Sequence, residues 1–201
     1  MSDETEIILE IFDFDGTLFA NPFPTKEMWP KGVFGKLNFQ WYQQPETLAM
    51  PWIPENPGLE WWNACMLKRA RMVAKDRPNT IPIVMTGRRR ALFEQQVVRL
   101  LKTQGLLDGV FLAVILKPEG KTTFQYKVES IQRQMENFGA TKVKMWDDRY
   151  KHVKRFNAWF EEQGIDGECR YVRWPYDTLL TQEQEQEIGD IIIKREGIVH
   201  K

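Results

Sequence analysis

Short apolar runs and amphipathic stretches alternate along most of this chain. Near-continuous apolar runs are typical of strands buried on both faces, and they predict five strands at residues 7–12, 80–87, 109–116, 142–146 and 169–174. Stretches with apolar residues on one helical face predict helices at 59–75, 88–105, 122–139 and 151–163 and a last helix after Thr181. This alternation favours an α/β fold in which a mostly parallel sheet lies between two layers of helices.

The segment at about 20–78 interrupts this pattern. It is rich in proline and aromatic residues, and we interpret it as a long ordered insertion, or cap, within a single domain that spans residues 1–201. Five of the eight tryptophans lie in it: Trp29, Trp41, Trp52, Trp61 and Trp62. A small packed core under the insertion is the favoured explanation for these rings, and the alternative is a set of exposed rings on which nucleobases stack.

Charge and cysteine content narrow the function classes. The 28 basic and 28 acidic side chains cancel, so the overall charge does not favour a nucleic-acid or membrane binder. Only Cys65 and Cys169 are present, far apart in sequence, and we expect both to be buried. No signal-like segment or long apolar run occurs. These features indicate a reduced, cytoplasmic protein with no membrane partner.

Polar side chains gather where the predicted strands end. Two acids follow the first strand, a threonine ends the second, and two more acids follow the fourth: Asp13, Asp15, Thr86, Asp147 and Asp148. The carboxyl ends of parallel strands meet at one edge of a sheet, which is where such folds bind ligands. Crowded carboxylates repel one another unless they share a cation, and several hard oxygen ligands suit Mg²⁺. The sequence therefore predicts a magnesium site at this edge.

Four motifs in this order resemble the haloacid dehalogenase (HAD) superfamily of phosphotransferases: DFDGT, TGR, Lys127 in the helix after the third strand, and WDDR. More narrowly, FDFDGTLF, the Pro- and Trp-rich insertion, MTGR and WDDRYKHVKRF are similar to the phosphatase domains of Swiss-Army-knife RNA-repair proteins and of polynucleotide kinase-phosphatases. The resemblance covers about residues 7–174. It implies a Rossmann-like three-layer sandwich with an aromatic-rich insertion after the first strand.

The resemblance also implies catalytic roles. Asp13 would attack phosphorus and form an aspartyl-phosphate, and Asp15 would act as general acid and then general base. Thr86 would hydrogen-bond the phosphoryl oxygens, and Lys127 would offset negative charge on the nucleophile and the transferring group. A structural alternative for Lys127 is a solvated surface charge on its helix.

The implied metal ligands are Asp147, with or without Asp148, together with Asp13 and the carbonyl group of Asp15. Mg²⁺ is the implied cofactor.

The arginines near these motifs have two interpretations. Gly87, Arg88 and Arg149 are candidate substrate-binding residues, because the two arginines follow strand ends where a phosphate would bind. Arg149 could equally be an ion-pair partner for Asp148. Arg89 and Arg90 are interpreted as solvated charges at the start of a helix.

The resemblance thus implies a HAD-type phosphatase that hydrolyses phosphomonoesters with Mg²⁺ through an aspartyl-phosphate. The preferred substrate, by resemblance, is the 3′-phosphate of an RNA or DNA end during end repair. The alternatives are a phosphatase of small metabolites or nucleotides and a non-catalytic binding module of the same fold. No P-loop motif occurs, so a kinase or ligase step would come from a separate chain.

Overall fold

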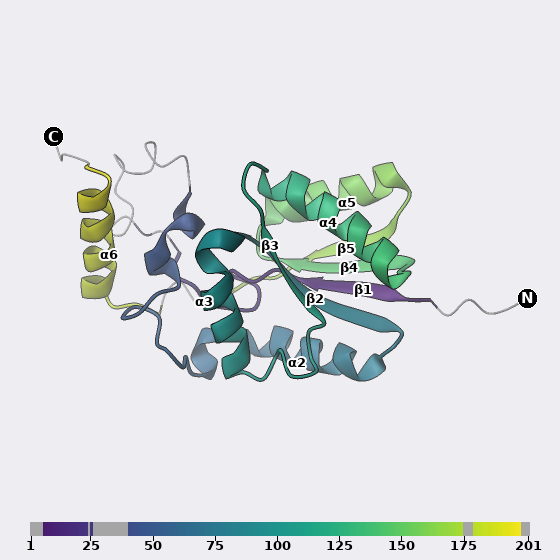
Figure 1. Ribbon diagram of the computed structural model, residues 1–201, viewed down its shortest axis with the longest axis horizontal. Coiled ribbons are helices and arrows are strands. Elements are labelled where there is room, and N and C mark those ends of the chain that lie inside the picture. The colour runs from purple at the N-terminus through teal and green to yellow at the C-terminus, as the bar shows by residue number, and fades with distance from the viewer. Residues whose placement is uncertain (1–5, 24, 26–39, 175–178, 198–201) are drawn as a thin grey trace, which may run out of the picture.

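A five-stranded sheet forms the centre of the protein (Figure 1). The computed structural model describes residues 6–23, 25, 40–174 and 179–197. Within them the strands are β1 (Ile8–Phe12), β2 (Thr80–Arg89), β3 (Ala113–Lys117), β4 (Lys142–Asp147) and β5 (Asp166–Tyr171). They follow the order β3-β2-β1-β4-β5, and each neighbouring pair is parallel. This confirms the predicted α/β sandwich and brings the ends of β1, β2 and β4 side by side.

Helices cover both faces of the sheet (Figure 1). One layer contains α2 (Ala64–Val73) and α3 (Arg90–Thr103), and the other contains α4 (Thr123–Phe138) and α5 (Tyr150–Gln163). A separate helix, α6 (Gln182–Arg195), lies beside the insertion (Figure 1). Four short 3₁₀ helices complete the described elements: Trp41–Gln43, Pro45–Thr47, Leu59–Trp61 and Ala74–Asp76.

The limits of α4 follow from local chemistry. The Thr122 side chain accepts a hydrogen bond from the Gln125 N–H, and the Gln125 side chain accepts one from the Thr122 N–H, which makes a reciprocal capping box. Gly139 ends the helix in the left-handed region, with φ of 63°. These contacts fix where α4 begins, directly above the edge of the sheet that carries the acids.

Several predicted boundaries differ from the structure. Arg88 and Arg89 belong to β2 rather than to the following helix, because β2 continues to pair with β3 past a register shift between Thr86 and Arg89. The third strand begins at Ala113 instead of residue 109, and β5 ends at Tyr171. Residues 59–61 form a 3₁₀ turn, and α2 begins later, after its N-cap Asn63. The predicted burial of Cys65 is wrong, because Cys65 is exposed, whereas Cys169 is buried.

The insertion packs as part of the main core. The four described tryptophans of this segment are all buried: Trp41 (2% exposed), Trp52 (8%), Trp61 (6%) and Trp62 (3%). They share one apolar cluster with residues of α3, including Phe93 and Val97. Trp62 packs edge-on against Phe19, with ring centroids 5.0 Å apart. The packed-core interpretation therefore fits these four rings, and Trp29 lies outside the described residues.

Helix α6 contacts the insertion through several side chains, among them Arg195. The Arg195 guanidinium donates to Glu46 Oε1 and to Gln44 Oε1, each at 2.5 Å. Glu46 and Gln44 are buried, so this contact joins α6 to the 3₁₀ segment whose Thr47 contacts Arg88.

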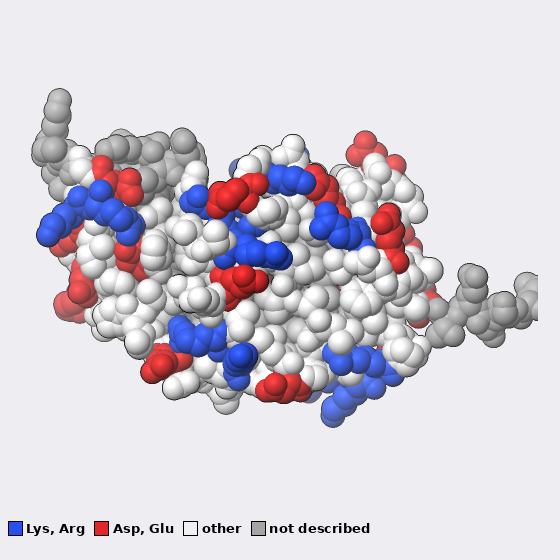
Figure 2. All heavy atoms as spheres, in the orientation of Figure 1, with Lys and Arg blue, Asp and Glu red and all other residues white. Residues whose placement is uncertain are grey.

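Basic and acidic side chains are interspersed over the face in Figure 2, as the balanced charge would suggest. None of the described helices has the length and apolar character needed to cross a lipid bilayer.

We predict that Trp62→Ala destabilises the whole domain, because the ring joins the insertion to the shared core. Removal of a buried tryptophan should lower the free energy of unfolding by roughly 3–5 kcal/mol. Urea denaturation followed by circular dichroism should still show one transition, whereas Leu59→Ala, at an exposed side chain, should change little. Two separate transitions, or a loss below about 1 kcal/mol, would show that the insertion does not fold with the sheet.

Candidate functional site

The acids of the first motif lie in a tight loop at the end of β1. Asp13 leaves the strand with its N–H bonded to the Trp146 carbonyl oxygen at 2.9 Å, so the ends of β1 and β4 are held together. Gly16 adopts φ of 65°, and a Cβ there would lie 2.3 Å from Asp148 Oδ2. Position 16 therefore requires glycine for two reasons: the positive φ of the backbone and the close approach of Asp148.

A buried lysine joins the two strand ends. Lys127 is 0% exposed, and its ammonium group lies 3.1 Å from Asp13 Oδ1 and 3.0 Å from Asp147 Oδ2. The backbone N–H of Phe14 also donates to Asp13 Oδ1, at 2.9 Å. Lys127 is the fifth residue of α4, and its side chain points inward to the acids. The alternative of a solvated surface charge is wrong for this lysine.

The acids around Lys127 have strongly displaced pKa values. Burial is the largest effect on Asp13 and raises its pKa to about 7, with the Lys127 charge acting in the opposite direction. Burial, followed by repulsion from Asp13 and Asp147, raises the pKa of Asp148 to about 8. Burial also opposes the charged form of Asp147, but Lys127, His152 and the Arg149 N–H together lower its pKa below the ordinary range.

Lys127 itself stays charged. Burial favours loss of its proton, but the carboxylates of Asp13 and Asp147 outweigh burial and raise its pKa.

Three carboxylates are close enough to share a cation. Oxygens of Asp13, Asp147 and Asp148 all lie within 4.8 Å of one another. Burial is the main cause of the raised pKa values of Asp13 and Asp148, and repulsion from the neighbouring acids adds to it. A divalent ion bound between these acids would relieve that repulsion. The donor set of hard carboxylate oxygens fits Mg²⁺. The Asp15 side chain lies outside this cluster, and ligation by its carbonyl stays a prediction.

The Asp15 carboxylate is paired with Arg88 and lies apart from the cluster of the other three acids. Arg88 Nη2 donates to Asp15 Oδ1 at 2.7 Å, and Arg88 Nε lies 2.9 Å from Oδ1 and 3.1 Å from Oδ2. The Thr86 hydroxyl contacts Asp15 Oδ2 at 3.3 Å. Arg88 and Thr86 are both 0% exposed, so these contacts are shielded from bulk water. The structure thus places Arg88 against the acid, with the Phe93 ring 4.7 Å beneath its guanidinium carbon.

The insertion completes the contacts of Arg88. Its remaining nitrogen, Nη1, donates to the Thr47 hydroxyl at 2.7 Å and to the Tyr42 carbonyl oxygen at 3.0 Å. The Thr47 hydroxyl donates in turn to the Gln44 carbonyl oxygen at 2.6 Å. These insertion residues were missed from the sequence, because nothing in a Pro- and Trp-rich stretch indicates that the Thr47 hydroxyl will reach Arg88, 41 positions away along the chain.

Neighbouring residues of the WDDR motif and the following helix hold Asp147 in place. The Arg149 N–H donates to Asp147 Oδ1 at 2.9 Å, and the Arg149 side chain lies 2.7 Å from His152 Nδ1. His152 Nδ1 lies 3.6 Å from Asp147 Oδ2, a contact that sequence analysis missed although the histidine lies only five positions after Asp147. Arg149 is exposed and lines the open side of the site, where a ligand could reach it.

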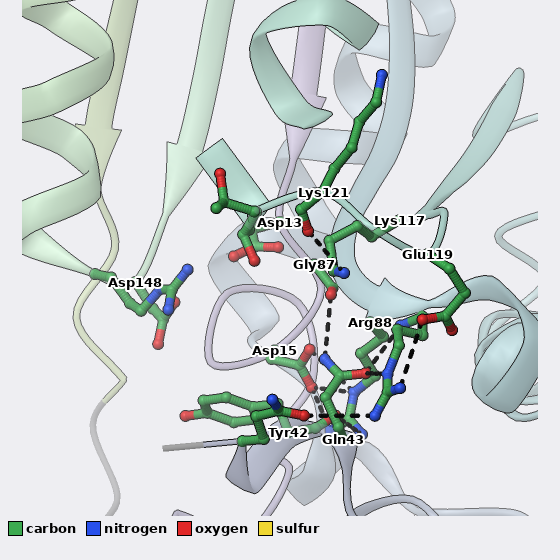
Figure 3. A pocket seen from close by; sticks show the side chains of 15 residues that line it. Asp13, Asp15, Tyr42, Gln43, Gly87, Arg88, Lys117, Glu119, Lys121 and Asp148 are labelled. Atoms are coloured by element: carbon green, nitrogen blue, oxygen red, sulfur yellow. Dashed lines mark hydrogen bonds and ion pairs between the residues drawn. The ribbon is translucent and has the colours of Figure 1, made fainter. Parts of the chain in front are cut away.

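A pocket of about 480 Å³ opens over the acids (Figure 3). Asp13, Asp15 and Asp148 lie along its floor, and Tyr42 and Gln43 from the insertion form one side. Gly87 also lines the pocket, and its carbonyl oxygen accepts a hydrogen bond from Gln43 Nε2 at 3.2 Å. A Cβ at Gly87 would lie 2.8 Å from Thr123 Cγ2, so glycine allows β2 to approach the start of α4. The pocket lining therefore combines acidic side chains with cationic ones, from both Lys and Arg.

All the sequence-predicted residues meet at this edge of the sheet. Asp13, Asp147, Asp148 and Lys127 form one group, and Asp15, Thr86 and Arg88 form a second group beside it. Gly87 and Arg149 line the pocket. Arg89 is partly buried against Gln43, and Arg90 is exposed as predicted.

Two solved structures with a similar fold are forms of one bacterial domain. They are the HAD domain of the effector protein Lem4 from Legionella pneumophila and its inactive mutant. The mutant is 13% identical with a TM-score of 0.50, over 96% of this chain and 99% of that one. The other form is 14% identical with a TM-score of 0.50, over 94% and 97%. At this identity the likeness shows the HAD fold alone.

A curated relative is the uncharacterized protein YMR265C of Saccharomyces cerevisiae, 29% identical over 205 residues. The match covers 90% of this chain but only 43% of the yeast protein.

The family comparison covers most of the chain. The model of HAD domain family 1 in Swiss Army Knife RNA repair proteins matches residues 21–193, which include Thr86, Lys127 and Asp147. Asp13 and Asp15 precede the matched range, and the structure places them beside those residues. Motifs, fold and family model agree, and the chain belongs to HAD domain family 1 of Swiss Army Knife RNA repair proteins.

Proposed function

We propose that this protein is a Mg²⁺-dependent phosphomonoesterase that acts through an aspartyl-phosphate, with the 3′-phosphate of an RNA end as its preferred substrate. The observation that carries the proposal is the fully buried Lys127, which contacts both Asp147 and Asp13, an acid that lines an open pocket. A buried ammonium group beside a carboxylate nucleophile is suited to stabilise the charge of a transferring phosphoryl group.

In this mechanism Asp13 supplies the nucleophile. Its Oδ1 atom is already held by Lys127 and by the Phe14 N–H, so Oδ2 would attack phosphorus. The P–O bond to the leaving alcohol breaks as the bond to Asp13 forms. Water then attacks the phosphorus of the aspartyl-phosphate, which releases inorganic phosphate and restores the carboxylate.

Asp15 would manage the protons of both steps. It would give a proton to the leaving oxygen and then accept one from the attacking water. The proton would reside on Oδ2, whose contacts with Thr86 and Arg88 are longer than those that Oδ1 makes with Arg88. Arg88 would keep the carboxyl group aimed at the leaving oxygen, and the Thr47 hydroxyl would hold Arg88.

The residues that would hold Mg²⁺ are Asp13, Asp147 and Asp148, with the Asp15 carbonyl as a further ligand. A bound Mg²⁺ would offset negative charge on the phosphoryl oxygens.

The substrate class rests on the family, whose members occur in RNA repair proteins. Because the four described tryptophans of the insertion are buried, recognition of a nucleic-acid end would depend on the polar rim of the pocket rather than on these rings. A separate ligase or kinase chain would complete end repair. Phosphatase activity on small metabolites, and a binding module without turnover, are the competing functions that the following experiments distinguish.

Asp13→Asn should reduce phosphate release by at least about a thousandfold, because an amide keeps the shape of the side chain but is not a competent nucleophile. Steady-state release from an aryl phosphate measures the loss, and a thermal melt checks the fold. Asp108→Asn, at an exposed loop acid, is the matched control and should be fully active. Activity retained by a folded Asp13→Asn protein would end the covalent mechanism.

Mg²⁺ should stabilise the protein, since it binds the folded acid cluster and not the unfolded chain. At a Mg²⁺ concentration roughly a hundredfold above Kd, the gain in the free energy of unfolding is about 2.7 kcal/mol, measurable as a higher Tm than in excess chelator. Asp148→Asn should reduce the shift, and chelator should stop hydrolysis by the wild-type protein. Identical melting curves with Mg²⁺ and with chelator would contradict the metal assignment.

Thr47→Val should impair only substrates that need a proton from Asp15. For an alkyl phosphate, whose leaving group is strongly basic, we expect kcat/KM to fall about tenfold, since Arg88 loses a buried hydrogen-bond acceptor. For p-nitrophenyl phosphate, whose leaving group departs without protonation, kcat/KM should hardly change.

Thr47→Ser keeps the hydroxyl, so its kcat/KM for the alkyl phosphate should be close to the wild-type value. An equal fall for both substrates would mean that Thr47 acts on the fold and not on the proton transfer.

A further inference from the structure

Lys117 lies on the wall of the catalytic pocket at the end of β3. The residue is only 9% exposed, and its ammonium group donates to two carbonyl oxygens, Lys121 O at 3.1 Å and Pro118 O at 3.4 Å. Its side chain folds back into the pocket, whereas that of Lys121 extends out of it (Figure 3). The two lysines of this wall therefore have different environments.

Among the described residues, no carboxylate lies within ion-pair distance of the Lys117 ammonium. Glu119, on the same loop, is paired instead with Arg89, at 3.5 Å. Loss of water around the Lys117 ammonium is the largest effect on this group and lowers its pKa, with the more distant Glu119 acting in the opposite direction. A nearly buried cation that is hydrogen-bonded only to neutral carbonyl oxygens has no counter-charge, and a bound anion would supply one.

The other lysines near the acids are already balanced. Lys127 lies between two aspartates, and the outward ammonium of Lys121 is paired with Glu129. Lys117 shares its pocket with Asp13 and Asp15, so an anion bound to it would lie in the same cavity as the reacting phosphate. At about 480 Å³ the cavity is in the size range that holds whole small molecules, not just one phosphate group.

We propose that Lys117 forms a second anion subsite that binds another phosphate of the same substrate, beside the phosphomonoester that Asp13 attacks. The inference rests on the proposed phosphatase activity and narrows its substrate class to molecules with two neighbouring phosphates. In a nucleic-acid end the second phosphate is the adjoining phosphodiester, and in a small molecule it is a second monoester. Arg89, at the rim and bonded to Gln43, would contribute longer-range attraction.

The test compares four substrates: an aryl phosphate, a nucleoside 3′-phosphate, a nucleoside 3′,5′-bisphosphate and a sugar bisphosphate. Wild-type kcat/KM should be at least about tenfold higher for one of the bisphosphates than for the nucleoside 3′-phosphate, as a charged hydrogen bond in a partly buried site provides. The advantage should shrink as salt is added. A preference for the nucleoside bisphosphate identifies a nucleic-acid end as the source, and a preference for the sugar bisphosphate identifies a metabolite.

Lys117→Met should abolish the preference while leaving hydrolysis of the aryl phosphate intact. Lys121→Met is the matched control on the same wall and should keep the preference. Lys117→Gln serves as a second variant if Lys117→Met does not fold. Calorimetric binding of the two nucleotides to Asp13→Asn gives the same comparison without turnover.

The outcomes separate the two proposals. If the wild-type protein hydrolyses the aryl phosphate but treats mono- and bisphosphates alike, or if Lys117→Met keeps the preference, the second subsite is wrong and the phosphatase function stands. If the aryl phosphate is not hydrolysed but the bisphosphate binds more tightly in a Lys117-dependent way, the subsite stands and the phosphatase function is wrong.

Discussion

The site depends on one buried positive charge. Lys127 reaches from α4 to the ends of β1 and β4 and contacts Asp13 and Asp147 at about equal distances, 3.1 and 3.0 Å. An ammonium group with no exposed surface is tolerable only where carboxylates surround it, and carboxylates this crowded are tolerable only where cations are close. The sheet order places β4 directly beside β1. The capping box fixes the start of α4, and with it the position of Lys127 relative to the two strand ends. The fold therefore places the Lys127 ammonium group where the charges of Asp13 and Asp147 stabilise it.

A second buried cation gives the insertion a part in the chemistry that we propose. Arg88 divides its donors between Asp15, on the sheet, and Thr47 with the Tyr42 carbonyl, on the insertion. The same insertion segment contacts Arg195 of α6 through Gln44 and Glu46. The insertion thus packs its tryptophans into the core and presents polar groups at the site. In this account it positions a proton donor, which differs from a cap that only covers the substrate.

Much of this arrangement could be predicted from the sequence. Periodicity located all five strands, and their parallel order brings Asp13, Thr86 and Asp147 to one edge of the sheet, as the motifs indicated. The motif order also marked Lys127 as a candidate site residue, and the structure buries it between Asp13 and Asp147. The partners of Arg88 could not be predicted, because local patterns do not show that β2 continues past Thr86 or that Thr47 folds against it. The difference between Lys117 and Lys121 could not be predicted either. Lys117 ends β3 and Lys121 lies on the short loop that follows, and only the folded chain buries one ammonium group and exposes the other.

The central claim is that Asp13 becomes covalently phosphorylated, and chemical trapping tests it most directly. Wild-type protein is mixed with substrate and Mg²⁺, quenched with acid during turnover and treated with borohydride, which reduces an aspartyl-phosphate to homoserine. Peptide mass spectrometry then locates the reduced residue. The account predicts homoserine at position 13 only when substrate is present. Reduction at another acid, or active protein that yields no trapped residue while a known acyl-phosphate enzyme treated alongside does, would contradict it.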